Sequence, residues 1–418
     1  MIHPMRRCAA WVKSAVSTLR HLVPTGGLVI TAVAISPAMA SIQGTQIEIE
    51  GPQNSTGWLP FTFSRRSRIL LIGEVNGERA VILLDSGAEK SVVDARLATR
   101  IKLRPVGSTT FSDRRSVTTA PLVGGVDLSL GSLHIKGLTA LVADLAPIGT
   151  MTGMDIGVLL GREIFESAVV DIDFPRERIA FSVVQGFSPP GGAPSTALHR
   201  SEAGHGRLIE VTLEDRQRVK LDFDLGSANP IILQHPFWSS TGLASERRVS
   251  NSLIGGIGGI REAGLISLRS VALAGVRVRN VDALLEAPRG SLEGRLGSGV
   301  IGLPILSQFR IITDYTRERL YLVRDASTEV KELSRNRSGL RVLQEGATLR
   351  VLLVARHSPA EKNGWQAGDR IVAVNGHPID DAYWTGDLWR WAEAPAGTRV
   401  TLTTGDGSTR EIELDDYY

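Results

Sequence analysis

The chain has 418 residues, 42% of them hydrophobic and 22% charged, which is enough for two or three domains with ordinary cores. It contains 44 glycines, 5% aromatic residues and a single cysteine, so a turn-rich β protein is favoured over a helical bundle. One cysteine excludes an intramolecular disulfide and a zinc finger, and the formal net charge is +3.

The first 40 residues differ in kind from the rest. They hold four basic residues and no acidic one, then an apolar run over residues 27–35 and the small-residue pattern Ala38-Met39-Ala40. This order predicts a secretory signal peptide cut after Ala40, and hence a periplasmic or secreted protein. An uncleaved membrane anchor is the alternative. Cleavage would leave 43 basic and 44 acidic residues and remove Cys8, so the basic balance does not predict a nucleic-acid partner.

From residue 41 onward, short apolar runs alternate with turn residues, which predicts a series of strands. Predicted strands at 68–75 and 79–84 flank Asn76-Gly77, a dipeptide typical of tight hairpins. Further strands are expected at 126–130, 133–142, 169–174, 208–213 and 219–223. Residues 185–206 are rich in Pro and Gly and predict a linker, and the polar residues 324–338 predict a second one. The remainder, residues 339–418, combines strand patterns with one helical stretch near 380–394.

An internal repeat divides the chain before residue 324 into two similar halves. Each half has an apolar strand that ends in Asp-x-Gly-small, beginning at Asp85 and at Asp224. Each continues to an apolar-apolar-Gly segment, which ends at Gly161 and at Gly302. The separations from Asp to Gly are 76 and 78 residues. Two landmarks at nearly the same spacing predict duplicated lobes, residues 41–184 and 207–323.

The repeated aspartates Asp85 and Asp224 are candidate catalytic residues. A single Asp-Ser-Gly after a strand is usually only a turn, because Asp and Ser bond their own backbone. Pseudo-twofold packing of two lobes would bring both carboxylates together, and such a pair keeps one shared proton. One carboxylate could then activate a water while the other donates a proton to a carbonyl. This chemistry hydrolyses a peptide bond without a cofactor.

The Asp-Ser-Gly-Ala motif and the later apolar-apolar-Gly segment resemble the retropepsin-like (clan AA) aspartic proteases. The resemblance implies a mainly β fold with two pseudo-twofold lobes in one chain and with Asp85 and Asp224 as the catalytic dyad. It also implies that the active-site loops are supported by four neighbours, namely Ser86, Gly87, Gly226 and Ser227. A glycine-rich flap would cover the substrate in lobe two, with candidates Gly255, Gly256, Gly258 and Gly259. The flap of lobe one is expected within residues 108–125.

One residue departs from the family pattern. A Ser or Thr follows each catalytic Asp in the family, and its hydroxyl helps to lock the two loops together. Ser86 keeps this feature, whereas Leu225 offers no hydroxyl. Two hypotheses therefore stay open: an aspartic endopeptidase that acts on polypeptides, and a non-catalytic adaptor that binds peptides.

Residues 358–376 are similar to the signature of bacterial PDZ domains, with Ser-Pro-Ala at the start, Gly368-Asp369 within and Asn375-Gly376 at the end. The resemblance implies a β domain with short helices over residues 339–418. Such a domain binds a polypeptide C-terminus or an extended segment as an added strand. Candidate peptide-binding residues are Gly339, Leu340 and Leu388. The alternative for Trp384, Leu388 and Trp391 is that they only form the core-facing stripe of a helix.

Several other classes lack support in the sequence. None of the eight histidines lies in an H-E-x-x-H motif or another metal-ligand spacing, so no metal is expected. No G-x-S-x-G motif supports a serine protease. We expect a polypeptide substrate and a PDZ ligand, no nucleic acid, and membrane contact only through an uncleaved leader.

Overall fold

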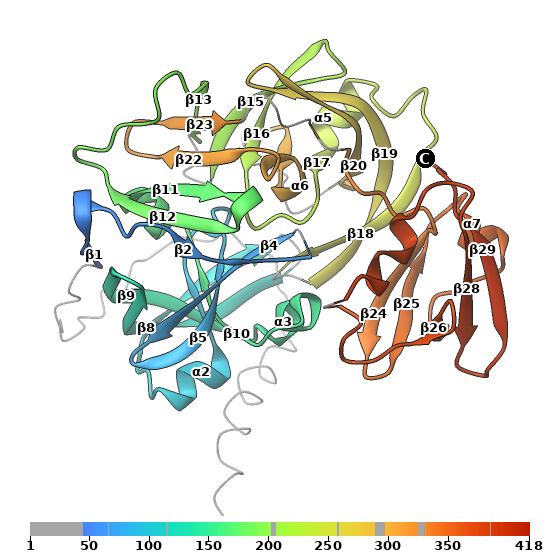
Figure 1. Ribbon diagram of the computed structural model, residues 1–418, viewed down its shortest axis with the longest axis horizontal. Helices are drawn as coiled ribbons and strands as arrows, with labels where there is room; N and C mark the ends of the chain where they lie inside the picture. The colour runs from blue at the N-terminus through green and yellow to red at the C-terminus, as the bar shows by residue number, and fades with distance from the viewer. Residues whose placement is uncertain are drawn as a thin grey trace, which may run out of the picture. The chain divides into compact units, whose positions relative to one another are not determined.

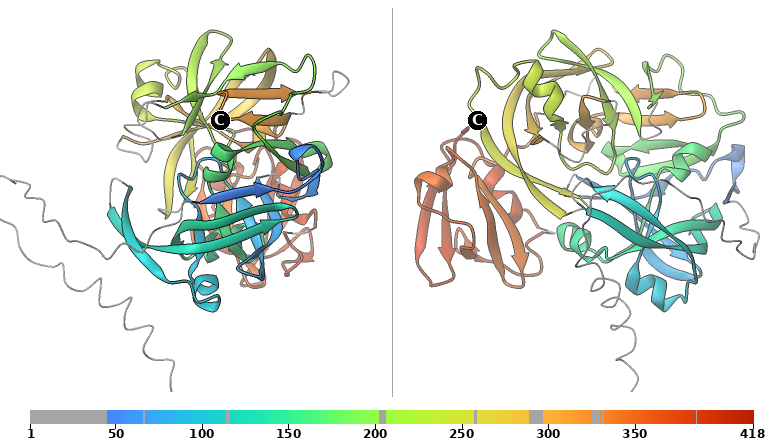
Figure 2. Two further views of the ribbon diagram at one scale, coloured as in Figure 1. Left: turned by 90° about the vertical axis from the view of Figure 1, so that its left-hand side faces the viewer. Right: turned by 180° about the vertical axis from the view of Figure 1, so that it is seen from behind.

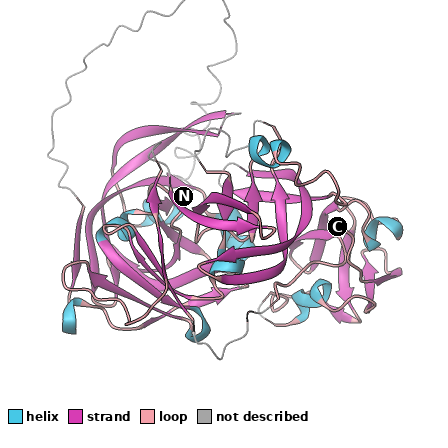
Figure 3. Ribbon diagram, turned by 90° about the horizontal axis from the view of Figure 1, so that it is seen from above, coloured by secondary structure: helices cyan, strands magenta, loops and turns pink. Residues whose placement is uncertain are grey.

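The computed structural model describes residues 45–65, 67–113, 116–201, 206–256, 259–288, 297–324, 330, 332–384 and 386–418. The predicted signal peptide, Gly258 and part of the second predicted linker lie outside these residues. Strands dominate the described chain and the helices are short (Figure 3), which confirms the mainly β class. None of these helices has the length and apolar character needed to cross a membrane.

Lobe one is built around a hairpin of β4 (Arg68–Val75) and β5 (Glu78–Leu84). Asn76 and Gly77 connect the strands with φ angles of 50° and 81°, which confirms the predicted tight turn. β5 also pairs in parallel with β10 (Ile156–Leu160), and β10 pairs on its other edge with β6 (Val92–Asp94). These three neighbouring strands of lobe one therefore fix the position of Asp85, the residue after β5.

The remaining elements of lobe one complete a nine-stranded sheet with the order β1-β9-β6-β10-β5-β4-β8-β7, with β3 on β4. Its other strands are β1 (Gln46–Ile49), β3 (Thr62–Ser64), β7 (Pro105–Asp113), β8 (Ser116–Leu130) and β9 (Leu133–Ala143). Three short helices flank them: α2 (Ala95–Arg100), α3 (Ala146–Thr152) and α4 (Glu163–Ser167). β8 begins ten residues earlier than the prediction, because it continues into the hairpin with β7.

Lobe two repeats this topology, except that β1 has no counterpart in its eight-stranded sheet. Its strands are β15 (Arg207–Leu213), β16 (Gln217–Phe223), β17 (Ile231–Leu233), β18 (Ser250–Gly256), β19 (Gly259–Leu273), β20 (Val276–Leu285) and β21 (Gly299–Ile301). β16 pairs in parallel with β21 as β5 does with β10, and β17 pairs with β21 and β20 as β6 does with β10 and β9. The helices α5 (His235–Ser240) and α6 (Leu303–Leu306) stand where α2 and α4 do. The sequence repeat therefore corresponds to a repeat of topology.

A third sheet joins the two lobes. Its order is β13-β23-β22-β11-β12-β2, and Figure 1 shows β11 (Ala168–Asp173) and β12 (Arg178–Val183) beside β22 (Arg310–Asp314) and β23 (Arg319–Val323). The edge strands are β2 (Leu59–Pro60) and β13 (Ser195–Ala197). Across the β11–β22 pair, Arg310 donates two hydrogen bonds to the Asp171 carboxylate, at 2.9 and 2.7 Å. Backbone pairing and a bidentate ion pair thus hold the lobes together.

The first predicted linker, residues 185–206, is not wholly a loop. It contributes β13 to the shared sheet and β14 (His199–Arg200) to lobe two, where β14 pairs with β15. These strands are two or three residues long, and β13 pairs with β23, which is distant in sequence. No periodic pattern can develop over such a length, so composition alone suggested a loop.

The C-terminal domain is a separate sheet with its own core. Its strands are β24 (Leu340–Glu345), β25 (Thr348–Val354), β26 (Arg370–Val374), β27 (His377–Pro378), β28 (Arg399–Thr404) and β29 (Thr409–Glu413), with α7 (Pro359–Lys362) between β25 and β26. The predicted helical stretch near 380–394 is wrong in extent, since only the 3-10 helix η3 (Leu388–Glu393) forms. Asp380 accepts the N–H groups of Ala382 and Tyr383 in a turn, and Gly386 follows, so a continuous helix is interrupted.

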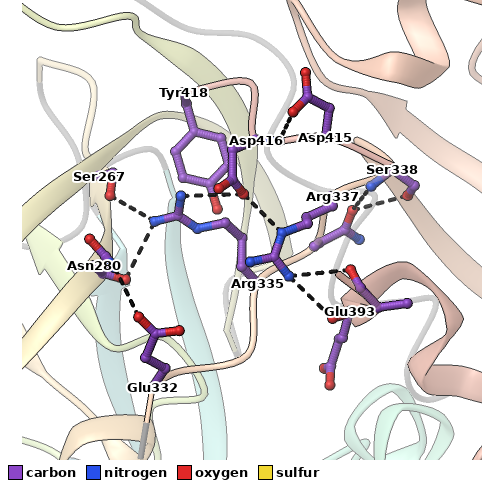
Figure 4. Close-up of polar contacts among 12 residues, drawn as sticks. Ser267, Asn280, Glu332, Arg335, Arg337, Ser338, Glu393, Asp415, Asp416 and Tyr418 are labelled. Carbon is purple, nitrogen blue, oxygen red and sulfur yellow. Dashed lines mark hydrogen bonds and ion pairs between the residues drawn. The ribbon is translucent and has the colours of Figure 1, made fainter. Parts of the chain in front are cut away.

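A polar cluster fastens the C-terminal domain to lobe two (Figure 4). The Arg335 side chain, 9% exposed, lies 3.2 Å from the Asp282 carboxylate and donates to Ser267 at 2.7 Å. Arg337 pairs with Asp416 at 3.0 Å, and the Tyr418 hydroxyl donates to Asp282 at 2.6 Å. Both ends of the domain therefore contribute to this cluster. Arg335 and Arg337, near the end of the second predicted linker, make specific polar contacts in it.

Candidate active site

Asp85 and Asp224 occupy matching places in the two lobes. Asp85 follows β5 and donates its backbone N–H to the Leu160 carbonyl at 3.0 Å. Asp224 follows β16 and donates its N–H to the Ile301 carbonyl at 3.1 Å. Both residues are half-buried. The parallel strand pairs therefore hold the two aspartates at the ends of equivalent strands.

Each carboxylate is oriented by the backbone of its own loop. Asp85 Oδ1 accepts the N–H groups of Gly87 at 2.8 Å and Ala88 at 3.2 Å. Asp224 Oδ1 accepts the N–H of Gly226 at 2.7 Å. Hydrogen bonds from backbone N–H groups to an ionised carboxylate are strong, so they fix the direction of each side chain.

The two carboxylates meet across the loops. A Cβ atom built on Gly226 would lie 2.2 Å from Asp85 Cγ, and one built on Gly87 would lie 2.5 Å from Asp224 Oδ1. Each carboxylate therefore rests against the glycine of the opposite loop, at a place where no larger residue fits without displacing it. The structure brings together the two aspartates that the sequence repeat predicted as a pair.

Burial and proximity change the acidity of this pair. Burial and, second, the neighbouring Asp224 charge raise the pKa of Asp85 to about 7, although the N–H of Gly87 and the Arg68 cation lower it. Two carboxylates in this position cannot both ionise easily, so they hold a proton between them up to about neutral pH.

Two glycine segments support the aspartate loops from below. Arg162 donates its backbone N–H to the Ala88 carbonyl at 2.9 Å, and Leu303 donates its N–H to the Ser227 carbonyl at 3.0 Å. A Cβ on Gly161 would lie 2.9 Å from Ala88 O, and one on Gly302 would lie 2.7 Å from Ser227 O. These glycines permit the close approach of backbone that the hydrogen bonds require.

The connection between the two loops is one-sided. The Ser86 hydroxyl accepts the Leu225 N–H at 3.0 Å and donates to the Phe223 carbonyl at 3.4 Å. The Leu225 side chain is fully buried in the core of the lobes and has no polar group to bond the loop of lobe one. Among the described residues, the Ser227 hydroxyl bonds only to the backbone of Asn229 in its own loop. Lobe one therefore contacts the loop of lobe two through the hydrogen bonds of the Ser86 hydroxyl, whereas lobe two contributes the apolar packing of Leu225.

Two residues near the pair carried no signal in the sequence. Burial lowers the pKa of Arg68, and the charges of Asp85 and Asp224 oppose this shift, so the cation lies within electrostatic reach of both carboxylates. Continuing the registers of the two hairpins places Arg68 opposite Asp85 but Gly206 opposite Asp224. Burial raises the pKa of Tyr315, whose ring stacks on Phe165 with a centroid separation of 5.6 Å.

The predicted flap segments are β-hairpins at equivalent places in the two lobes (Figure 2). β7 and β8 pair from Pro105 to Val123 and cover the segment expected in lobe one. In lobe two, β18 and β19 place Gly255 and Gly256 opposite Ile260 and Gly259. Gly258 lies outside the described residues. A role of these hairpins over a substrate remains a prediction.

The C-terminal domain presents an open strand edge beside η3. Within the described sheet, β24 pairs only with β25, so its other edge is free. The N–H groups of Gly339 and Leu340 at the start of β24 donate to Asn336 Oδ1 at 2.9 Å and Ser338 Oγ at 3.0 Å. The backbone N–H groups of these two candidate peptide-binding residues therefore already have acceptors in the side chains of their own loop. Leu388 packs against the domain core, in line with the core alternative.

No group of three or more His, Cys, Asp or Glu residues with the geometry of a metal site occurs in the described part of the chain.

Comparisons with known proteins assign two parts of the chain. Residues 71–164, which include Asp85, match the family model of the aspartyl proteases, and residues 350–404 match that of a PDZ domain. No curated protein matches the chain. Among solved structures, basic 7S globulin from soybean is similar with a TM-score of 0.38 and 8% identity, over 65% of this chain and 95% of that one. This chain therefore combines a retropepsin-like aspartyl protease domain with a PDZ domain near its C-terminal end.

Proposed function

We propose that this protein is an aspartic endopeptidase with Asp85 and Asp224 as its catalytic dyad. The observation that carries the proposal is the reciprocal contact in which each carboxylate lies against the glycine of the opposite loop. The family match of residues 71–164 supports a hydrolase of this class.

The reaction follows from the shared proton. The ionised carboxylate removes a proton from a bound water, whose oxygen attacks the scissile carbonyl carbon. The protonated carboxyl donates its proton to the carbonyl oxygen, which gives a neutral tetrahedral diol. Proton transfer back to the amide nitrogen then lets the C–N bond break, so that a carboxyl end and an amine end are released. The chain needs no cofactor for these steps.

The test is hydrolysis of a peptide library by the purified protein from about pH 4 to about pH 8, read by mass spectrometry, a range that spans the ionisation of the pair. Asp85→Asn and Asp224→Asn should each abolish cleavage. Asp155→Asn is a matched control, since this lobe-one carboxylate is 76% exposed and should leave cleavage unchanged. Cleavage that persists equally in both dyad variants would refute the proposal.

A non-catalytic peptide-binding adaptor is the second candidate, and Leu225 is the residue that favours it. The fully buried Leu225 stands after Asp224, where the family pattern has a Ser or Thr hydroxyl. An adaptor would bind peptides without cutting them at any pH, and the two dyad variants would bind as well as the unchanged protein.

The PDZ domain is proposed to bind polypeptide ends or extended segments. The free edge of β24 can accept an extended peptide as an added strand, with η3 as the opposite wall of the groove. Its ligand would be a substrate or a regulatory polypeptide.

Export is proposed from the leader sequence. The basic segment, the apolar run and the Ala38-Met39-Ala40 pattern support cleavage after Ala40 and a periplasmic or secreted protein. N-terminal sequencing of the protein from the envelope fraction of a bacterial host should begin at Ser41. A chain that retains residues 1–40 would contradict this proposal.

A further inference from the structure

The groove of the PDZ domain opens into a cavity that it shares with the protease lobes. The cavity has a volume of about 640 Å³, in the range of ligand-binding pockets. One wall is formed by β24 and by three tryptophans of the segment around η3, Trp384, Trp389 and Trp391. The facing wall comes from the lobes and includes Phe63, Arg65 and Phe174. A peptide in the groove would therefore lie against lobe one as well as against the PDZ domain.

Arg65 brings an uncompensated cation into this cavity. Its guanidinium carbon lies 3.4 Å from the centre of the Trp384 ring, which holds the group by a cation–π contact. Among the described residues, its Nε and Nη2 atoms are buried and find no hydrogen-bond partner. Burial lowers the pKa of Arg65 to about 10. Buried guanidinium nitrogens without an acceptor are costly, so an acceptor group that entered the cavity beside them would be stabilised.

The carboxylates that line the same cavity each have another partner. Asp282 contacts Arg335 and Tyr418, and Glu393 pairs with Arg390 at 3.2 Å. Glu332 accepts from Asn280 at 3.0 Å, and Glu177 accepts the Phe63 N–H at 3.4 Å. The cavity lining contains two arginines, Arg341 of the PDZ domain and Arg65 of lobe one, so lobe one adds the positive charge of Arg65 to that of the domain.

The position of Arg65 along the groove identifies which part of a peptide it would meet. At one end, Arg337 N donates to the Ala392 carbonyl at 2.7 Å, so the start of β24 lies beside the end of η3. At the other end, Gln344 Nε2 donates to the Asp380 carbonyl at 2.8 Å, close to Trp384 in sequence. Arg65 therefore lies toward the Gln344 end. The distance from Leu340 to Gln344 corresponds to about four residues of an extended peptide.

We propose that Arg65 of lobe one completes the PDZ groove and selects extended peptides that carry an Asp or Glu side chain about four residues before their C-terminal end. The inference rests on the proposed peptide binding by the PDZ domain and adds to the groove a cation that comes from lobe one. The N–H groups of Gly339 and Leu340 are already bonded, so the loop at the other end attracts a terminal carboxylate only weakly.

The test uses fluorescein-labelled heptapeptides with a free C-terminus and an apolar last residue, made in pairs with Glu or Gln at one upstream position. Binding is measured by fluorescence polarisation with the full chain carrying Asp85→Asn, so that the peptides stay intact. At one position the Glu peptide should bind at least about tenfold more tightly than the Gln peptide. Arg65→Leu should bring this ratio to about one by weakening the Glu peptide alone.

Two further variants separate charge from folding. Arg104→Leu removes an exposed arginine of lobe one and should keep the full Glu preference. Arg65→Glu should reverse the preference, so that a Lys peptide binds more tightly than the matched Gln peptide. Thermal melting of each variant shows whether the fold is retained.

Three results would overturn the inference while peptide binding by the PDZ domain stands. The first is a ratio of Glu-peptide to Gln-peptide affinity near one at every position. The second is an affinity ratio that Arg65→Leu leaves unchanged. The third is an equal gain of affinity for both peptides in Arg65→Leu, which would mean that Arg65 only blocks the groove. Absence of any peptide binding would overturn the proposed PDZ function together with this inference. Hydrolysis is judged separately, by the dyad variants.

Discussion

Ser86→Ala tests whether the one-sided connection between the active-site loops stabilises the lobes. Ser86 is 1% exposed, and its hydroxyl is the acceptor for the backbone N–H of the fully buried Leu225. The substitution leaves that N–H without an acceptor, which costs about 1–3 kcal/mol of unfolding free energy. The second bond, to Phe223, is 3.4 Å long and adds little.

The measurement is differential scanning calorimetry of the purified protein, with the transition of the lobes followed separately from that of the PDZ domain. For a protein of this size, about 2 °C of Tm corresponds to 1 kcal/mol, so the lobe transition should fall by about 2–6 °C. The matched control is Ser227→Ala, because this hydroxyl bonds only within its own loop, to Asn229 at 3.3 Å. A loss of Tm in Ser86→Ala that does not exceed the loss in Ser227→Ala would refute the reasoning.

Three further predictions concern the dyad. Hydrolysis should decline as the pH rises through about 7, where the pair loses its proton. Arg68→Gln should move this decline to higher pH, because Arg68 lowers the pKa of Asp85. The measurement is a pH–rate profile of both proteins. The folded pKa of Asp85 exceeds the unfolded value of about 4, so its contribution to stability is full below pH 4 and is lost as the pH rises through 7. Asp85→Asn should therefore raise Tm at pH 8 relative to the unchanged protein more than at pH 4, and an equal change at both would contradict the raised pKa. Gly226→Ala would place a Cβ 2.2 Å from Asp85 Cγ and displace the carboxylate, so kcat should fall at least about a hundredfold. The circular dichroism spectrum should be retained. An unchanged kcat would show that the carboxylate is free to move.

The sequence predicted those features that depend on repeated local motifs. The hairpin at Asn76-Gly77 follows from the two positive φ angles that its turn requires. The meeting of Asp85 and Asp224 follows from equal spacing of landmarks in two lobes, since equivalent topology puts equivalent residues on a common axis. In these cases a few neighbouring residues determine the conformation.

The missed features depend on contacts between distant segments. Arg68 begins an ordinary strand, and only the packing of the two lobes shows that it lies near both carboxylates. Arg65 is one arginine among many until lobe one and Trp384 are brought together. The strands β13 and β14 exist because partners are available, and η3 is short because Asp380 and Gly386 interrupt its helical pattern.

The joining of both lobes in one chain has a genetic consequence. In a dimer of identical subunits a single codon specifies both loops, so every substitution appears on both sides of the site. Here Ser86 and Leu225 are encoded separately, as are Arg68 and its counterpart Gly206. Mutation and selection can therefore act on one half of the site alone. The two carboxylates that share the proton consequently have different neighbours.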